Sequence, residues 1–410
     1  MNTGSQTVRS ILLVCQFFPP NAGGGRAYRA SKLVKYWTSQ GVRVVVLCGS
    51  DTVDPDKSLL DDVDPALLHI VRVDTGSERF VGLRRVLRQL VIGDGNLLLI
   101  WRMLDRLMKE QIGIVPDIVF TSSAPYEVHY LGHMIRKRWG SRWVADFRDP
   151  YTLNRHYRKL TPLGKYFDRR FERSIYQQAD GVVFNTGLNK KQALAAFGLD
   201  DCARYEVFQN GFDADEFARV LPLEPPAEQD TFRIAYIGGI RCDDHELALL
   251  KAIQSHREEL REQRVQFLFA GNGSEQLAAH LDASLDDGLI ECLPFIASGD
   301  LHHYWNQAHA LVLALPDSEQ ALGWVPQKLY SYLRAGRPIL GIVPAGEAAE
   351  YLDSVSSNVV VSPGEYDLPD ATLKLRRLAN AAMDVQAIER FSQLTIFGRQ
   401  LEWLGQLADD

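Results

Sequence analysis

Three glycine-containing loops stand where backbone amides can approach an anionic ligand. Asn21–Arg26 contains three consecutive glycines, Gly238-Gly239 follows the apolar run Phe232–Ile237, and Gly271-Asn272-Gly273 follows Val265–Ala270. Glycine has no side chain, so such loops let N–H groups reach a phosphate, and a following helix adds the positive end of its dipole. Each loop alone is also typical of an ordinary turn. The two loops of the second half, taken together, predict a phosphate site.

Lys328 lies in the stretch Trp324–Leu340, whose pattern indicates a short helix followed by a strand. Leu329, Tyr332 and Leu333 are spaced as one buried helix face, and Gly336 ends the helix. A lysine near the start of a helix adds a mobile positive charge to the helix dipole, which suits a diphosphate. The alternative is a solvated surface lysine.

Asp146, Arg148 and Asp149 come at the end of the apolar run that begins at Trp143. Carboxylates at the C-terminal edge of a strand, beside a cleft, are candidates for proton handling or for binding hydroxyl groups. Asp149 precedes Pro150, so a simple turn is the alternative interpretation.

Other chemistries are poorly supported. The Asp-x-Asp pairs that begin at 54, 62 and 213 lack the rigid strand end and further ligands of a metal site, so no metal is predicted. No histidine has zinc spacing with cysteines, and no serine nucleophile elbow is present. Asn21–Arg26 fails the Gly-x-Gly-x-x-Gly spacing, which makes a nicotinamide enzyme the least favoured class.

Short, nearly continuous apolar runs alternate with helical patterns, as in a doubly wound parallel α/β sheet. In the first half, Ala27, Ala30, Leu33 and Trp37 form the first helix face. The strands predicted there are Ile11–Cys15, Val42–Cys48, Ile70–Val73, Asp117–Thr121, Trp143–Asp146, Gly181–Phe184 and Glu206–Phe208.

The alternation restarts after the proline-rich, acidic segment Leu221–Asp230, which reads as a linker. The strands predicted in the second half are Phe232–Ile237, Val265–Ala270, Leu289–Leu293, Ala310–Leu315, Ile339–Ile342 and Val359–Val361. We therefore expect one α/β domain over residues 1–220, a second over 231–385, and a C-terminal helix, 386–410, that packs back on the first. Two such domains facing each other place a ligand cleft near their strand ends.

Composition and charge narrow the class of protein. The 410 residues, 46% hydrophobic and 24% charged, fit two or three globular domains. No apolar run approaches a membrane span, no secretory signal is evident, and five cysteines fit reduced thiols, so a cytoplasmic location is expected. Residues 1–210 carry 30 Lys and Arg against 21 Asp and Glu, whereas the rest carry 15 against 31. The two halves are therefore expected to have different partners.

Residues 79–109 interleave basic and apolar side chains, with Arg84, Arg85 and Arg88 among leucines and valines. Such a pattern on helices describes a surface that can rest on anionic lipid at the inner face of the membrane. The alternative is that these helices pack on the core of the domain and that the aliphatic parts of the arginine side chains cover apolar surface. No nucleic-acid partner is predicted.

Several segments together resemble glycosyltransferase family 4, the retaining sugar transferases of GT-B fold. They run in the family's order over roughly residues 11–344 and are QFFPPNAGGGRAYR, VADFRDP, VFQNGFD, YIGGI, FAGNG and PQKLYSYLRAGRPIL. The resemblance implies transfer of a sugar from a UDP- or GDP-sugar to an acceptor, without a metal or other cofactor. It also implies a glycan or lipid-linked acceptor in the first domain and the nucleotide in the second.

The resemblance also implies roles for individual residues. Arg241 and Lys328 would stabilise the leaving diphosphate, and Asp149 is the substitute for the family's catalytic histidine. The donor-binding residues implied are Gly24, Gly25, Gly238, Gly239, Gly271, Asn272, Gly273, Phe295 and Ser331. The acceptor-side residues expected are Arg26, Asp146 and Arg148.

The sequence departs from the family at a pair of glutamates, where it has Gly323 and Ser331. Ser331 can hydrogen-bond a ribose hydroxyl but cannot act as a carboxylate. Asp317 or Glu319 would have to supply the sugar-binding carboxylate. The departure leaves two alternatives open, a catalytically altered nucleotide-sugar-binding protein and a nucleotide-sugar epimerase of the same fold.

Overall fold

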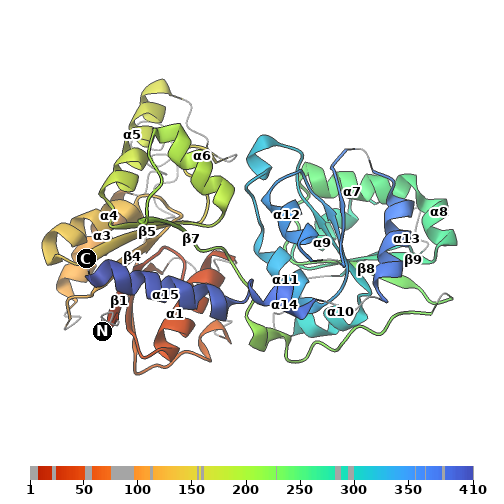
Figure 1. The fold of residues 1–410 in the computed structure, drawn as a ribbon, viewed down its shortest axis with the longest axis horizontal. Helices are drawn as coiled ribbons and strands as arrows, with labels where there is room; N and C mark the ends of the chain where they lie inside the picture. The colour runs from red at the N-terminus through yellow and green to blue at the C-terminus, as the bar shows by residue number, and fades with distance from the viewer. Residues whose placement is uncertain are drawn as a thin grey trace. The chain divides into compact units, whose positions relative to one another are not determined.

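The computed structural model divides the chain into two compact units, Met1–Asn210 with Gln393–Asp410 and Gly211–Ser392, here called unit 1 and unit 2 (Figure 1). The residues that the structure describes are 8–20, 25–50, 58–74, 97–110, 114–154, 157, 161–227, 229–281, 288–293, 300–355, 357–364, 366–380 and 384–409.

Unit 1 is built on a seven-stranded parallel sheet of order β3-β2-β1-β4-β5-β6-β7. Its strands are β1 Ser10–Val14, β2 Arg43–Gly49, β3 Leu68–Val73, β4 Ile118–Ser122, β5 Arg142–Phe147, β6 Gly181–Phe184 and β7 Tyr205–Val207. Its helices are α1 Gly25–Ser39, α3 Leu97–Lys109, α4 Val128–Trp139, α5 Pro162–Gln178, α6 Gly187–Phe197 and α15 Gln393–Asp409, with a 3-10 turn, η1, at Ser58–Leu60.

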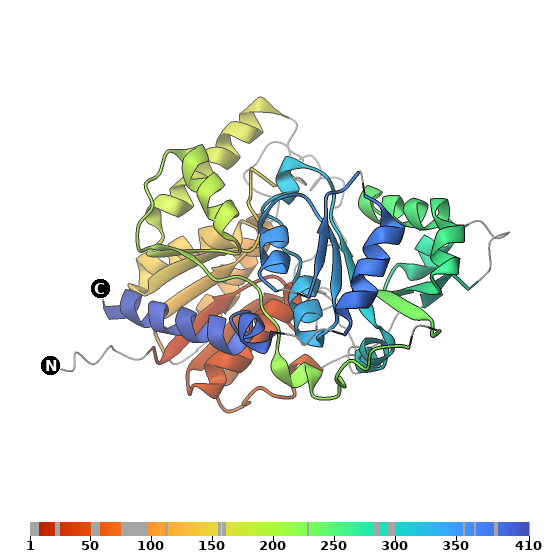
Figure 2. The same cartoon turned by 45° about the vertical axis from the view of Figure 1, so that its right-hand side comes forward.

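The strands of unit 1 are apolar on both faces because helices cover both. Ile11 and Leu13 of β1 pack with α1 and α15, whereas Leu12 and Val14 pack with α3 and α4. Successive side chains of a strand point to opposite faces, so the continuous apolar run fills two cores. The C-terminal helix α15 lies beside α1 in both views (Figures 1 and 2).

Unit 2 has a six-stranded parallel sheet of order β10-β9-β8-β11-β12-β13. Its strands are β8 Phe232–Ile237, β9 Val265–Ala270, β10 Ile290–Leu293, β11 Ala310–Ala314, β12 Ile339–Ile342 and β13 Val359–Val361. Its helices are α7 Asp244–Ser255, α8 Arg257–Glu262, α9 Ser274–Ala278, α10 Leu301–Gln307, α11 Gln327–Ala335, α12 Glu347–Asp353, α13 Leu368–Leu378 and α14 Val385–Glu389, with 3-10 turns η2 Ala214–Phe217 and η5 Glu319–Ala321.

The predicted fold class is confirmed, since all thirteen predicted strands are present and both sheets are parallel. The single predicted tail helix is two helices, α14 and α15, and Ser392 between them pairs with Phe212 in a parallel bridge. The contacts place residues 211–220 and 386–392 with unit 2, whereas the sequence grouped them with the first domain. The functions assigned to the two domains stay predictions.

Candidate functional site

The second and third predicted glycine loops lie side by side at the C-terminal edge of unit 2's sheet. They follow the paired strands β8 and β9, in which Ile237 is opposite Ala270. The N–H of Gly238 donates to the Ala270 carbonyl at 2.9 Å, and the N–H of Ile240 donates to the Asn272 carbonyl at 2.8 Å. Parallel pairing thus brings together two loops that are more than thirty residues apart in sequence.

Glycine is required at two positions of these loops. Gly271 has φ of +142° and Gly273 has φ of +97°, conformations that residues with a side chain rarely adopt. A Cβ at Gly271 would collide with the Gly238 carbonyl, and one at Gly273 with the Ile240 carbonyl. Gly239, by contrast, is exposed and has open space where a Cβ would lie.

Lys328 occupies the start of α11 and reaches the same edge of the sheet. Its Nζ donates to the Tyr236 hydroxyl at 2.7 Å and to the Gly239 carbonyl at 3.1 Å. The same nitrogen lies 3.9 Å from the centroid of the Tyr236 ring, a cation–π contact. A short helix that begins at Gln327 therefore places this ammonium directly beside the first glycine loop.

Glu246 is a buried carboxylate behind this lysine, and the sequence reasoning missed it. It accepts hydrogen bonds from the Tyr236 hydroxyl at 2.7 Å, the N–H of Arg241 at 2.9 Å and the N–H of Asp243 at 3.1 Å. Asp243 and Glu246 form a capping box at the start of α7. The Asp-x-x-Glu spacing before an apolar run was the signal that could have found this carboxylate.

The electrostatics at this edge favour an anion. Burial lowers the pKa of Lys328 from its usual value near 10.5 to about 7, with Glu246 opposing the shift and the positive charge of Arg241 adding to it. The Arg241 side chain is exposed, and among the described residues no carboxylate pairs with it. Two cations beside glycine loops with accessible backbone can hold a diphosphate.

The remaining donor-side predictions lie on or around α11. Ser331 is half-buried on this helix, one turn after Lys328, and Gly336 ends the helix with φ of +73°. Asp317 and Glu319 are both exposed; Asp317 lies two residues before η5, Glu319 is its first residue, and Gly323 follows that turn. Phe295 lies outside the described residues.

The acceptor-side predictions meet in a buried polar chain at the C-terminal end of β5. Asp146 is fully buried and accepts from the Ser122 hydroxyl at 2.7 Å. The same hydroxyl accepts from Arg148 Nε at 2.9 Å, and Arg148 Nε lies 4.0 Å from the Asp146 carboxylate. Burial lowers the pKa of Arg148, and the Asp146 charge opposes this shift. Asp146 therefore positions its neighbours from inside the fold.

Arg29 completes this chain and was also missed. Only 4% of its side chain is exposed, and its guanidinium lies 3.3 Å from Asp146. It also donates to the carbonyls of Phe208 and Gln209 and to the Asn210 amide oxygen at 3.0 Å. The sequence feature that could have identified Arg29 is its position between Ala27 and Ala30, where a charged residue falls on the side of the helix predicted to be buried.

The other first-half predictions have different surroundings. Asp149 is exposed, and its carbonyl and that of Pro150 accept from the Tyr126 hydroxyl at 3.3 and 2.9 Å. Gly25 is the first residue of α1, whereas Gly24 and the Arg26 side chain lie outside the described residues. Of residues 79–109, the structure describes 97–109 as α3.

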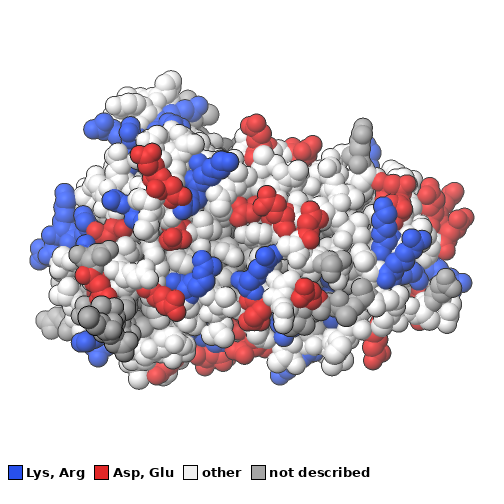
Figure 3. Space-filling model, in the orientation of Figure 1, with Lys and Arg blue, Asp and Glu red and all other residues white. Residues whose placement is uncertain are grey.

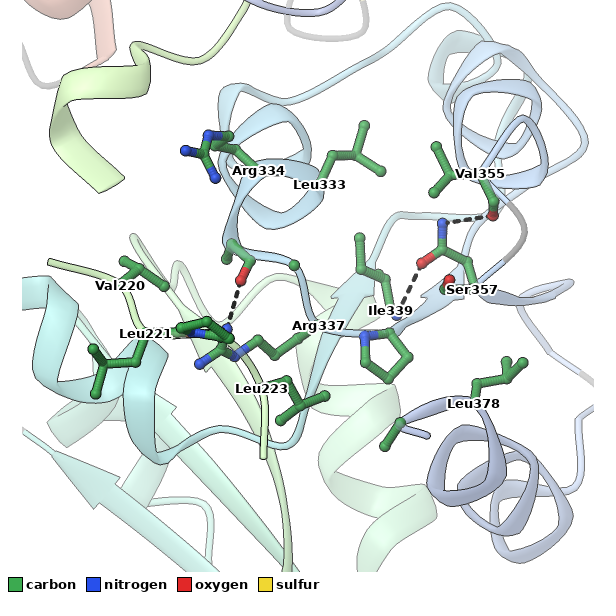
Figure 4. A pocket seen from close by; sticks show the side chains of 16 residues that line it. Val220, Leu221, Leu223, Leu333, Arg334, Arg337, Ile339, Val355, Ser357 and Leu378 are labelled. Carbon is green, nitrogen blue, oxygen red and sulfur yellow. Dashed lines mark hydrogen bonds between the residues drawn. The ribbon is translucent and has the colours of Figure 1, made fainter. Parts of the chain in front are cut away.

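A cavity of about 360 Å³ in unit 2 is lined by none of the predicted site residues (Figure 4). The cavity lies at the N-terminal end of β12. Its lining residues include Leu221, Arg337, Ile339 and Ser357. Arg337 is buried, and its guanidinium donates to the carbonyls of Ala308, Leu221 and Ala335. These bonds join the segment that precedes β8 to the end of α11, which gives this arginine a structural role.

Among the residues that the structure describes, no three His, Cys, Asp or Glu side chains gather as a metal site requires. Within that same part of the chain, no helix has the length and apolar character needed to cross a membrane.

The fold and the family comparison together define a GT-B glycosyltransferase. Residues 23–216, nearly half of the chain, match the model of Glycosyltransferase Family 4. No curated protein has a significantly similar sequence. The match covers the loop of consecutive glycines, Arg29 and the Asp146 chain.

Solved structures of similar fold cover nearly the whole chain. HepE of Anabaena, in complex with UDP-glucose, has a TM-score of 0.63 at 16% identity, covering 96% of this chain and 98% of that one. Sucrose-phosphate synthase of Thermosynechococcus elongatus has a TM-score of 0.63 at 15% identity, covering 96% and 97%. The lipopolysaccharide outer core galactosyltransferase WaaB has a TM-score of 0.58 at 15% identity, covering 95% and 98%.

Proposed function

We propose that this glycosyltransferase moves a hexose from a UDP-sugar to a lipid-linked or surface polysaccharide precursor, with retention of the anomeric configuration. Unit 2 would bind the donor and unit 1 the acceptor. The observation that carries the donor half is Lys328 beside Gly238-Gly239 at the C-terminal edge of a parallel sheet, with Arg241 adding a second positive charge. Negative charge builds on the diphosphate as the sugar leaves, so these cations would lower the barrier.

Two lines support the choice of donor and acceptor. The neighbour HepE was solved with UDP-glucose, which favours a UDP-sugar over the GDP-sugar alternative. The neighbour WaaB acts on the lipopolysaccharide outer core, a glycan carried on lipid. Retention and independence of metal follow from the resemblance to family 4.

We propose that residues on the first unit handle the acceptor. The buried chain from Arg29 through Asp146 and Ser122 to Arg148 fixes the end of β5, and Asp149 follows with its side chain exposed. An exposed carboxylate held on a fixed strand end can accept a proton or a hydrogen bond from an acceptor hydroxyl. Arg26 and the loop at Gly24 and Gly25 belong to the same proposal.

Peripheral association with anionic lipid was predicted for residues 79–109, and α3 is the described part of that stretch. Trp101 is 64% exposed there and Arg102 follows it. An exposed tryptophan next to a cation suits the interfacial region of a bilayer. We propose that α3 contributes to such a contact.

Release of nucleotide from UDP-glucose, UDP-galactose and GDP-mannose, measured with bacterial lipid extracts as acceptor, tests the proposal. We expect turnover with a UDP-sugar, and loss of turnover in Lys328→Ala and Arg241→Ala. Lys251→Ala, an exposed lysine on α7, is the matched control. If Lys328→Ala keeps full turnover and full nucleotide affinity, the donor assignment is wrong. NMR of the product reports the anomeric configuration.

Two alternatives remain because Gly323 and Ser331 stand where the family has glutamates. A nucleotide-sugar-binding protein would bind UDP in calorimetry and transfer sugar to no acceptor. An epimerase would change the configuration of a sugar still attached to its nucleotide, which NMR of the donor alone would detect. A putative UDP-N-acetylglucosamine 2-epimerase of Listeria monocytogenes shares the fold, with a TM-score of 0.53 at 13% identity.

A further inference from the structure

Helix α5 exposes a group of apolar side chains at its N-terminal end. Leu163 is 61% exposed, Tyr166 58% and Phe167 38%, so three of the large exposed hydrophobics of the described residues fall within five positions. Their spacing of three and four residues puts them on one face of the helix. The Tyr166 and Phe167 rings pack edge to face with centroids 5.6 Å apart. An exposed apolar group of this kind marks an interaction site.

The charges of α5 are segregated by sign. Its cations Lys165, Arg169, Arg170 and Arg173 are all exposed, whereas its only two carboxylates, Asp168 and Glu172, are fully buried. Among the described residues no carboxylate forms an ion pair with Lys165, Arg170 or Arg173. Figure 3 shows Lys and Arg side chains on the surface at the upper left, where Figure 1 places α5. The outer face is therefore apolar and positive, with no negative charge of its own.

The inner face of α5 holds the loop that follows β5. Glu172 accepts from the N–H of Thr152 at 3.0 Å and from its hydroxyl at 2.6 Å, and Asp168 accepts from the Tyr157 hydroxyl at 2.9 Å. Burial raises the pKa of Glu172, and these hydrogen bonds oppose the shift. Asp149, the carboxylate proposed to act on the acceptor, lies near the start of the same loop. The buried carboxylates of Asp168 and Glu172 thus connect α5 to that loop, so a surface that binds the outer face of α5 would also hold the loop in place.

We propose that the outer face of α5 docks unit 1 on an anionic lipid bilayer. Leu163, Tyr166 and Phe167 would enter the headgroup–acyl boundary, and Lys165, Arg170 and Arg173 would contact lipid phosphates. Apolar side chains surrounded by cations are complementary to an anionic bilayer, whose acyl chains accept the apolar groups and whose headgroups carry the negative charge. The inference rests on the proposed function in one respect: docking would hold the loop that contains Asp149 at the membrane surface that carries a lipid-linked acceptor.

Co-sedimentation of the full chain with vesicles tests the docking surface without any measurement of transfer. Vesicles of phosphatidylglycerol with phosphatidylcholine are compared with vesicles of phosphatidylcholine alone, and we expect strong binding only to the first. The apolar variant Leu163→Ser/Tyr166→Ser/Phe167→Ser and the charge variant Lys165→Glu/Arg170→Glu/Arg173→Glu should each lower the partition coefficient tenfold or more. Thermal stabilisation by UDP-glucose, unchanged in both variants, shows that they are folded and that the donor site is intact.

Matched controls locate the effect. Leu373→Ser/Lys374→Glu changes an exposed apolar residue and a neighbouring cation on α13 of unit 2 and should leave the partition unchanged. Trp101→Ser should lower it less than the α5 variants do. The proposal is overturned if both α5 variants bind vesicles as the parent chain does, or if only the charge variant weakens binding. Loss of self-association in the apolar variant, with vesicle binding intact, would instead assign the face to a second copy of the chain.

Discussion

The Tyr236 hydroxyl accepts a hydrogen bond from Lys328 and donates one to Glu246, each at 2.7 Å. The tyrosine thus joins the cation at the start of α11 to the buried carboxylate at the start of α7. Because the phenol also lies under the ammonium, it fixes where the positive charge is held when no anion is present. Burial and the Glu246 charge both raise the pKa of Tyr236 well above its ordinary value, so the hydroxyl keeps its proton.

Replacement of Tyr236 by phenylalanine tests this bridge. The ring stays, but Glu246 loses one of three donors and Lys328 loses one of two acceptors, so we expect the free energy of unfolding to fall by about 1–2 kcal/mol. The affinity for UDP-glucose should fall severalfold because the ammonium is less well positioned. Chemical denaturation and calorimetry measure the two effects. Tyr366→Phe, in the same unit, removes a hydroxyl that forms no hydrogen bond with the described residues, and should change neither.

The pH dependence of donor binding should follow Lys328. Its pKa is about 7 in the free protein, and a bound diphosphate would raise it, so binding takes up a proton once the pH exceeds about 7. Affinity for UDP-glucose is then full below pH 7 and falls as the pH rises, by up to about tenfold per unit. Calorimetry in buffers of different ionisation enthalpy reports the proton uptake. The slope should vanish in Lys328→Met, and an identical slope in that variant would show that another group titrates.

Gly271 should be far less replaceable than Gly239. Alanine at Gly271 must adopt φ of +142° and place its Cβ against the Gly238 carbonyl, so we expect a loss of about 2–3 kcal/mol of stability. Gly239→Ala meets no atom within 4 Å and should cost less than about 0.5 kcal/mol. Thermal unfolding of both variants measures the difference. Equal melting temperatures would mean that the two loops are not packed as described.

Asp146 should be a large contributor to the stability of unit 1. Asp146→Asn leaves the buried Arg29 guanidinium without its carboxylate, and breaking a buried pair in this way costs about 3–5 kcal/mol. Asp105→Asn, which breaks an exposed pair with Lys109, is the control and should cost less than about 1 kcal/mol. Denaturant titration compares the two. A small effect at Asp146 would indicate that water reaches this chain.

The alternation of apolar runs and helical patterns was enough to predict the strands of both sheets. Strands covered by helices on two faces must be apolar throughout, and such a run can be recognised within a few consecutive residues. The glycine loops of the second half could also be predicted from the sequence, because they come directly after apolar runs that have the pattern of strands. Lys328 was found in the same way, from its place at the start of a short amphipathic helix.

Only the tertiary structure decided which side chains contact one another at the candidate sites. Arg29 and Asp146 are more than a hundred positions apart and meet because β1 and β5 flank β4. Glu246 and Tyr236 meet Lys328 only when β8 lies beside β11, and the sign segregation on α5 appears only once Asp168 and Glu172 are known to be buried. Local sequence sets the periodicity of each element, whereas strand order sets which charges face each other, and that order is a property of the whole chain.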